Sequence, residues 1–240
     1  MRYERTLAAV LVGALLSFGG AAAARADDKK PDDKKPESKP APAGATEKKP
    51  DAAPGMMDKK QIAAMMAMKG QPGSEHKMLD ALAGSFDVEI KMSMMPGTPP
   101  LVAHAVFEGQ WVLGKRFIQT MSKPAAGEEL KIESISYFGF DQRTEKYFWW
   151  GIDNTDTYSV FAEGEYDETS KTVTLFGENL EQGVGKMKFK VVLKLESADK
   201  HTMAVMFQAP EAMRATVPAG ALDKDGWFAI MESVATRKKQ

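Results

Sequence analysis

Cysteine is absent from all 240 residues of the chain. Its absence excludes disulfide bonds, thiolate nucleophiles and cysteine metal ligands, so the fold must be stable through core burial alone. An excess of charge of one sign is also absent, because 32 basic and 33 acidic residues leave a formal net charge of −1. We therefore expect no global field that attracts nucleic acid, and no nucleic-acid partner.

Catalytic signatures are lacking as well. The spacings H-E-x-x-H and G-x-S-x-G and the phosphate-binding loop do not occur in the sequence. The three histidines, His76, His104 and His201, stand far apart, and the carboxylates form no informative pair. These absences predict a protein that is not an enzyme and that carries no cofactor.

The N-terminal apolar run, Leu7 to Phe18, is short for a membrane-spanning helix. Two arginines precede it, and the small-residue segment after it ends with Ala24-Arg25-Ala26. This order is typical of a secretory signal peptide, residues 1–26, cleaved after Ala26. It predicts an exported protein, periplasmic or secreted, with no stable membrane insertion after cleavage.

Residues 27–55 contain no aromatic residue and no leucine, isoleucine or valine, but they hold six of the thirteen prolines. Such a segment cannot bury enough apolar surface to offset the entropy of ordering. The sequence predicts a disordered, charged tail that tethers or spaces the domain behind it.

Residues 56–70, MMDKKQIAAMMAMKG, hold five of the sixteen methionines. Asp58 and Gln61 have the spacing of a capping box, which predicts an accessory helix ended by Gly70. Methionine is adaptable in packing, so we interpret the segment as a helix that packs against another surface. The sequence does not identify that surface. Contact with a partner or a membrane surface is one alternative, and soft-metal binding, such as copper handling, is another. The weak candidates for metal ligands are Met65, Met66, Met68 and His76.

A folded domain is expected from residue 74 to residue 238. It opens with SEHKMLDALAG, in which Ser74 is placed to cap a short helix, Leu79 and Leu82 share a face, and Gly84 ends it. Regular alternation of apolar and polar residues follows, as in FDVEIKMSM and MKFKVVLKL. The strands are expected at 86–94, 101–109, 114–122, 130–139, 146–152, 157–164, 171–178, 186–196, 201–208 and 226–235.

About ten short strands separated by turns indicate an all-β fold, either a barrel or a sandwich. Closure removes exposed strand edges, and the helix before the first strand is suited to plug one end. We therefore predict a single antiparallel up-and-down barrel with a short N-terminal helix. The alternation does not decide which residues of the second to fourth strands face inward.

Four segments of this domain resemble a bacterial family known as domain of unknown function 1579. They are EHKMLDALAGSFDVEIKM (75–92), FEGQWVLGKRFIQ (107–119), YFGFDQRTEKYFWWGID (137–153) and GEYDETSKTVTLFGE (164–178). The chain departs from the family pattern at Lys115, where a second glycine is usual, and at Phe86, where tryptophan is usual. The resemblance implies a calycin-like barrel, related in shape to lipocalins and nitrobindin-type proteins, and it implies no activity.

A barrel of this size has room for one small apolar ligand, so we expect binding of a hydrophobic or amphipathic molecule in its interior. Arg116, where the family also has arginine, is a candidate for holding a ligand carboxylate; a surface arginine is the alternative. His201 is expected to face inward, where a haem-binding role is a further alternative. The complete set of candidate ligand-binding residues is Arg116, Tyr147, Trp149, Trp150, Phe189, His201 and Phe207.

Two other functions remain open. One is the handling of copper by the methionine clusters, and the other is a structural or interaction module with a filled barrel. Ligand identity and oligomeric state do not follow from the sequence.

Overall fold

The computed structural model describes residues 57–181 and 184–239. It divides into two units, residues 18–70 and the rest of the chain, and each is described by itself. The predicted signal peptide, 1–26, and the predicted tail, 27–55, lie outside the described residues. Within the described residues, no helix has the length and apolar character needed to span a bilayer.

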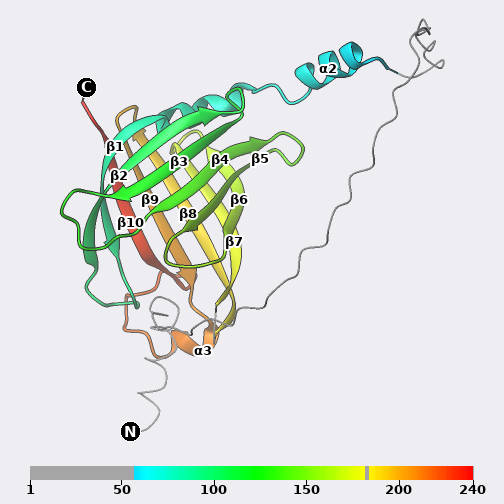
Figure 1. Ribbon diagram of the computed structural model, residues 1–240. Helices are drawn as coiled ribbons and strands as arrows, with labels where there is room; N and C mark the ends of the chain where they lie inside the picture. The colour runs from blue at the N-terminus through cyan, green and yellow to red at the C-terminus, as the bar shows by residue number, and fades with distance from the viewer. Residues whose placement is uncertain (1–56, 182–183, 240) are drawn as a thin grey trace, which may run out of the picture. The chain divides into compact units, whose positions relative to one another are not determined.

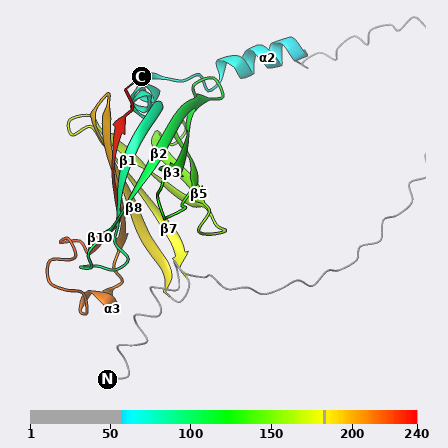
Figure 2. The same cartoon turned by 60° about the vertical axis from the view of Figure 1, so that its left-hand side comes forward.

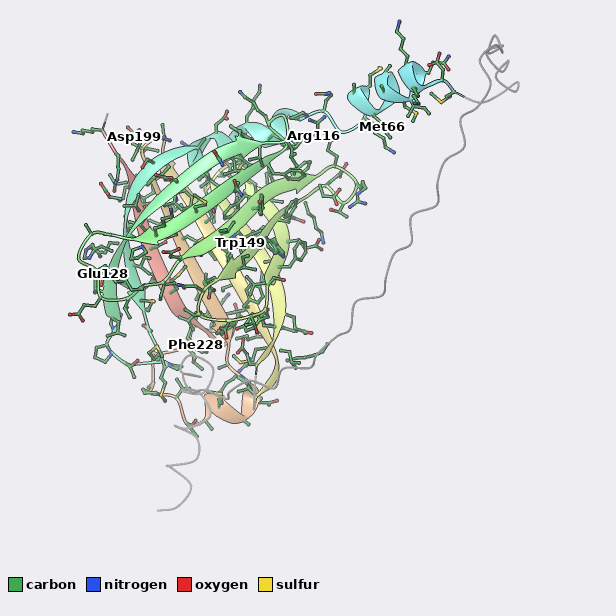
Figure 3. All side chains as sticks on the ribbon, in the orientation of Figure 1. Met66, Arg116, Glu128, Trp149, Asp199 and Phe228 are labelled. Atoms are coloured by element: carbon green, nitrogen blue, oxygen red, sulfur yellow. The ribbon has the colours of Figure 1, made fainter. Side chains whose placement is uncertain are left out.

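The methionine-rich segment forms helix α2, Lys59–Met68 (Figure 1). The predicted capping box is present: the Gln61 N–H donates to Asp58 Oδ1 at 2.7 Å, and the Asp58 N–H donates to Gln61 Oε1 at 2.9 Å. No residue of α2 is buried, and Met66, labelled in Figure 3, is 66% exposed.

The remaining elements belong to the folded domain. In chain order they are η1 (Ser74–Leu82), β1 (Gly84–Met92), β2 (Leu101–Val112), β3 (Phe117–Pro124), β4 (Ser134–Asp141), β5 (Lys146–Asp153), β6 (Val160–Asp167), β7 (Thr172–Glu181), β8 (Gly185–Ser197), β9 (Lys200–Gln208), α3 (Glu211–Arg214) and β10 (Trp227–Arg237).

The ten strands in the described part of the chain close into one antiparallel barrel (Figures 1 and 2). Each strand pairs with its neighbours in sequence, and β1 pairs with β10 to close the ring, with Phe86 opposite Arg237 and Met92 opposite Met231. The prediction of an up-and-down barrel of about ten strands is confirmed, and the alternative of a sandwich is excluded.

Strand β8 shows why the alternating pattern builds this barrel. Its inward face consists of Met187, Phe189, Val191, Leu193 and Leu195, each no more than 7% exposed. The lysines between them point outward, because successive side chains of a strand lie on opposite faces. Burying the apolar face inside the ring is therefore the main driving force that this strand contributes.

Element η1 is a 3₁₀ helix that closes one end of the barrel, called here the plug end. Leu79 and Leu82 are 1% exposed and belong to the same core cluster as residues of the barrel wall. The predicted cap at Ser74 is wrong. Gly73 is the N-cap residue, and its N–H donates to Nδ1 of His76 at 3.1 Å.

The hairpin between β2 and β3 differs from the prediction. Residues Leu113, Gly114 and Lys115 have left-handed φ angles of +50°, +67° and +63°, so this segment is a turn and β3 begins only at Phe117. The strand predicted at 114–122 therefore starts three residues too early. Lys115 occupies a left-handed position, which explains why glycine is usual there in the family pattern.

Candidate functional site

The plug end of the barrel is tightly packed and hydrogen-bonded. The Tyr147 hydroxyl donates to the backbone oxygen of Glu75 at 2.9 Å, and Trp111 Nε1 donates to Asp80 Oδ1 at 2.8 Å. Burial raises the pKa of Tyr147 to about 12, with a further contribution from Glu75. Tyr147, a predicted ligand contact, is thus used to hold η1 in place.

The opposite end, called here the loop end, carries the longer connections between strands and α3 (Figure 1). At this end Met187, Phe189 and Phe228 are at most 5% exposed. Five other inward-facing apolar side chains, in the middle and towards this end, are only partly buried, although strands surround them. They are Trp149, Val160, Met203, Val205 and Phe207. Since neighbouring strands separate these side chains from outside solvent, their accessible surface faces the interior.

Trp149 and Trp150 lie on opposite faces of β5, as their adjacency predicts. Trp149 packs inside, with its ring 6.4 Å from that of Phe138, whereas Trp150 lies outside, 5.8 Å from the ring of Tyr137. Figure 3 labels Trp149 in the middle of the barrel wall. Of the two, Trp149 is the one that can touch an interior ligand.

The indole N–H of Trp149 is buried and has no hydrogen-bond acceptor among the described residues. Two inward hydroxyls lie in the next row of the wall, where Thr120 Oγ1 and Ser136 Oγ are 2.9 Å apart and hydrogen-bond each other. Ser136 also faces Gly151, over which the edge of the Trp149 indole lies. This part of the wall is polar within an otherwise apolar interior.

Arg116 is not where the prediction placed it. It lies in the turn before β3, and its Nη1 donates to the Leu113 backbone oxygen at 3.0 Å. Figure 3 shows it near the plug end. The predicted strand position is wrong because Leu113 to Lys115 form a turn, so Arg116 caps this turn and does not line the interior.

His201 faces inward, but at the plug end. Its ring is 4.8 Å from that of Phe86 and 5.7 Å from that of Phe107, and the residue is 6% exposed. Burial, together with the nearby Arg237, lowers its pKa to about 4, so the ring is neutral at pH 7. The ring packs edge-on between the two phenylalanines, and its buried Nδ1 has no hydrogen-bond partner among the described residues.

The two other predicted contacts lie together near the loop end. The rings of Phe189 and Phe207 are 6.3 Å apart, and Phe207 is also 6.5 Å from Phe228. Phe189 is 2% exposed, whereas Phe207 keeps accessible surface. Phe207 can therefore contact a ligand directly, and Phe189 supports it from behind.

The predicted metal candidates are divided between the two units, and each is described by itself. His76 is buried, accepts from Gly73 and packs edge-on against Phe140 at 5.9 Å. No group of three or more histidine, aspartate or glutamate side chains in the described ranges is arranged to hold a metal ion. The thioethers of Met65, Met66 and Met68 lie on α2, in the other unit, and are exposed.

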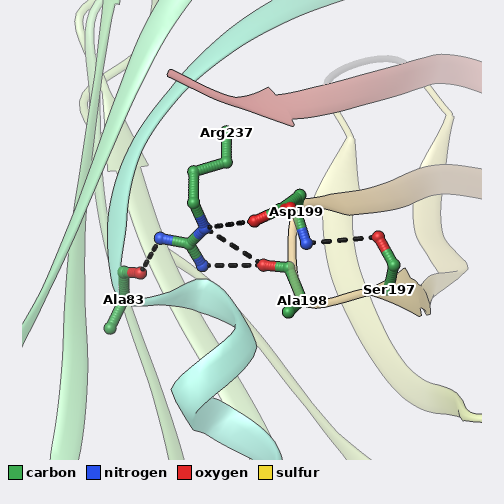
Figure 4. Close-up of polar contacts among 5 residues, drawn as sticks. All are labelled: Ala83, Ser197, Ala198, Asp199 and Arg237. Atoms are coloured by element: carbon green, nitrogen blue, oxygen red, sulfur yellow. Dashed lines mark hydrogen bonds and ion pairs between the residues drawn. The ribbon is translucent and has the colours of Figure 1, made fainter. Parts of the chain in front are cut away.

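Sequence reasoning missed Arg237, which crosses the plug end (Figure 4). Its Nη1 donates to the Ala83 oxygen at 2.7 Å, its Nε and Nη2 donate to the Ala198 oxygen, and its Nε lies 3.2 Å from Asp199 Oδ1. The guanidinium also lies over the Phe86 ring at 4.6 Å. No local signal marks this residue, because its partners are far away in the sequence.

Sequence reasoning also missed Glu181, at the end of β7. It is 9% exposed and has the inward parity of its strand, and burial followed by the nearby Asp156 raises the pKa of its carboxyl. A carboxyl group thus faces inward at the loop end. The alternation of β7 predicts that the Glu181 side chain faces inward. Its burial, however, depends on the connection formed by residues 154–159.

The comparisons with known proteins give a family. The family model described as "Protein of unknown function (DUF1579)" matches residues 71–219. No curated protein matches the chain. Among solved structures, the crystal structure of Rv2717c from M. tuberculosis covers 70% of this chain and 100% of its own, with 13% identity and a TM-score of 0.48. With its family model matched over most of the barrel, the chain belongs to the DUF1579 family of proteins of unknown function.

Proposed function

We propose that the protein binds a small hydrophobic or amphipathic molecule inside the barrel and is not an enzyme. The supporting observation is a set of inward-facing apolar side chains that keep accessible surface. At the plug end, inward side chains such as Leu79, Phe86 and Ile118 have at most 1% of their surface exposed. Beyond them, Met203, Val205 and Phe207 keep accessible surface although they face inward. Inward-facing apolar side chains that keep accessible surface favour an apolar ligand.

Fluorescence titration with the neutral probe N-phenyl-1-naphthylamine tests this proposal. We expect saturable binding of one probe per barrel. Val205→Phe places a larger side chain in the accessible region and should weaken binding at least fivefold. Ala204→Phe adds a larger side chain on the outward face of the same strand, and it should leave binding unchanged. Absence of saturable binding by the wild-type protein would contradict the proposed function.

Export is a separate part of the proposal and rests on the N-terminal sequence pattern. When the full chain is produced in a Gram-negative host, mass spectrometry of the periplasmic fraction should find a product that begins at Asp27. A product in the cytoplasm that still contains residues 1–26 would contradict it.

A further inference from the structure

We propose that the interior ligand is electrically neutral and carries a hydrogen-bond acceptor, such as a ketone, ester or quinone carbonyl, that receives the indole N–H of Trp149. This inference rests on the proposed function and specifies the ligand class. It follows from the charges that line the barrel and from a donor that lacks a partner.

The interior has no cation available for an anionic ligand. At the inward-facing positions of the ten described strands, Arg237 is the one lysine or arginine, and it lies at the plug end. Its guanidinium is already bound to the backbone oxygens of Ala83 and Ala198 and to Asp199 (Figure 4). Arg116 lies in a turn and bonds to that turn. A carboxylate inside the barrel would therefore lose its hydration without gaining a counter-charge, which is strongly unfavourable.

An acidic group makes the same region less favourable for an anion. The buried Glu181 carboxyl faces inward at the loop end, and Asp156 lies close enough to influence it. The negative charge of Asp156 that disfavours ionisation of Glu181 also disfavours a second negative charge that approaches the interior from the loop end. A neutral ligand experiences neither this repulsion nor the cost of burying an unpaired charge.

Trp149 supplies the donor. Its Nε1 has no acceptor among the described residues, and the nearby hydroxyls of Thr120 and Ser136 already bond each other. A buried N–H without a partner costs free energy, and a ligand carbonyl that accepts from it recovers that cost. Because Nε1 has no exposed surface, the indole must tilt to meet the ligand. The edge of the indole packs on Gly151, where a Cβ would lie 3.0 Å from Trp149 Cζ2, so the absence of a side chain there makes room for the indole.

The test uses three competitors with ten-carbon alkyl chains, 2-decanone, decanoate and decyltrimethylammonium, against bound N-phenyl-1-naphthylamine at pH 8. The first is a neutral acceptor, the second an anion and the third a cation. We expect 2-decanone to displace the probe at roughly tenfold lower concentration than either charged compound. Displacement by decanoate or by decyltrimethylammonium at an equal or lower concentration would overturn the inference of a neutral ligand.

Two further measurements test the donor. Trp149→Phe should weaken 2-decanone roughly five- to tenfold while the probe still binds, and Trp150→Phe, on the outer face, should change neither. In the wild-type protein, the indole ¹H–¹⁵N resonance of Trp149 should shift when 2-decanone binds. An unchanged resonance, or an unchanged affinity in Trp149→Phe, would overturn the role of Trp149. Loss of all saturable probe binding in the wild type would instead reject the proposed function, and the inference with it.

Discussion

The guanidinium of Arg237, in the last strand, donates to the backbone oxygen of Ala83, the residue that follows the plug helix, at 2.7 Å. The two residues are 154 positions apart. The same side chain bonds to the turn between β8 and β9 through the Ala198 oxygen and Asp199 (Figure 4). One arginine thus connects η1, the last strand β10 and the β8–β9 turn. The pairing of β1 with β10 and the position of η1 at the plug end therefore stabilise each other.

Arg237→Lys tests this connection. Lysine keeps the charge but cannot bond in the three directions that the guanidinium fork reaches. Hydrogen bonds from a charged group contribute about 1.5–3 kcal/mol each, and with the side chain 29% exposed we expect a loss of about 2 kcal/mol in the free energy of unfolding. Urea unfolding followed by circular dichroism measures it. Arg143→Lys, whose pair with Asp141 is confined to an exposed turn, should cost much less; equal losses would contradict the role of Arg237.

The packing of the plug is tested by Leu82→Ala. Leu82 is 1% exposed and belongs to the main core cluster, so its truncation should destabilise the fold by about 2–5 kcal/mol. Leu180→Ala provides the matched control, because Leu180 is 79% exposed and its loss should change the free energy of unfolding by less than about 0.5 kcal/mol. Chemical denaturation of both variants measures the two losses. Similar denaturation midpoints would show that the packing of η1 contributes little to the free energy of unfolding.

His201 predicts a loss of stability in acid. Its pKa is lowered to about 4 in the fold by burial and by Arg237, while the unfolded chain has a histidine pKa near 6.5. The unfolded state therefore binds the proton first, so this contribution to stability is present above pH 6.5 and is lost as the pH falls towards 4. The loss should reach about 3 kcal/mol at most.

His201→Phe removes this titration and should flatten the dependence of the unfolding free energy on pH between 6.5 and 4. His104→Gln is the control, because the His104 side chain is 61% exposed and its removal should leave the slope unchanged. Parallel pH profiles for the wild type and His201→Phe would show that the buried ring does not cause the acid sensitivity.

Lys115→Gly is expected to stabilise the protein. Lys115 has φ +63°, which costs a side-chain-bearing residue about 1–2 kcal/mol, whereas glycine adopts it freely. The more flexible unfolded chain offsets part of the gain, so the net increase should be about 0.5–1 kcal/mol. Thermal unfolding measures it. Lys188→Gly, within the regular strand β8, should have the opposite sign, and a destabilised Lys115→Gly would contradict the prediction.

The strands and their approximate limits follow from the sequence because each rests on local chemistry. In β8, every second residue is apolar, and only a strand places these residues on one face. The capping box of α2 is equally local, with its two partners three residues apart. Where the prediction failed, at Arg116, the expected strands left the turn at residues 110–113, whereas β2 continues to Val112 and the backbone turns at residues 113–115.

The candidate site was predicted less completely than the fold. The inward orientation of His201 and the opposite faces of Trp149 and Trp150 followed from alternation. The filling of the interior did not, since it depends on how ten strands curve around η1. The enclosure of His201 by Phe86 and Phe107 brings together strands β9, β1 and β2, and no pattern within one segment contains that information.

By itself, the sequence determined the all-β domain, the number of strands, the helix that precedes them and the lack of any catalytic motif. These features depend on side-chain periodicity and on residues close together in the chain. The tertiary structure alone decided that Arg237 is held by the plug end, that Arg116 stays in a turn, and that the buried N–H of Trp149 has no acceptor among the described residues. The physical reason is that burial and hydrogen bonding inside a closed barrel are set by contacts between distant strands, whose curvature and register a local pattern does not contain.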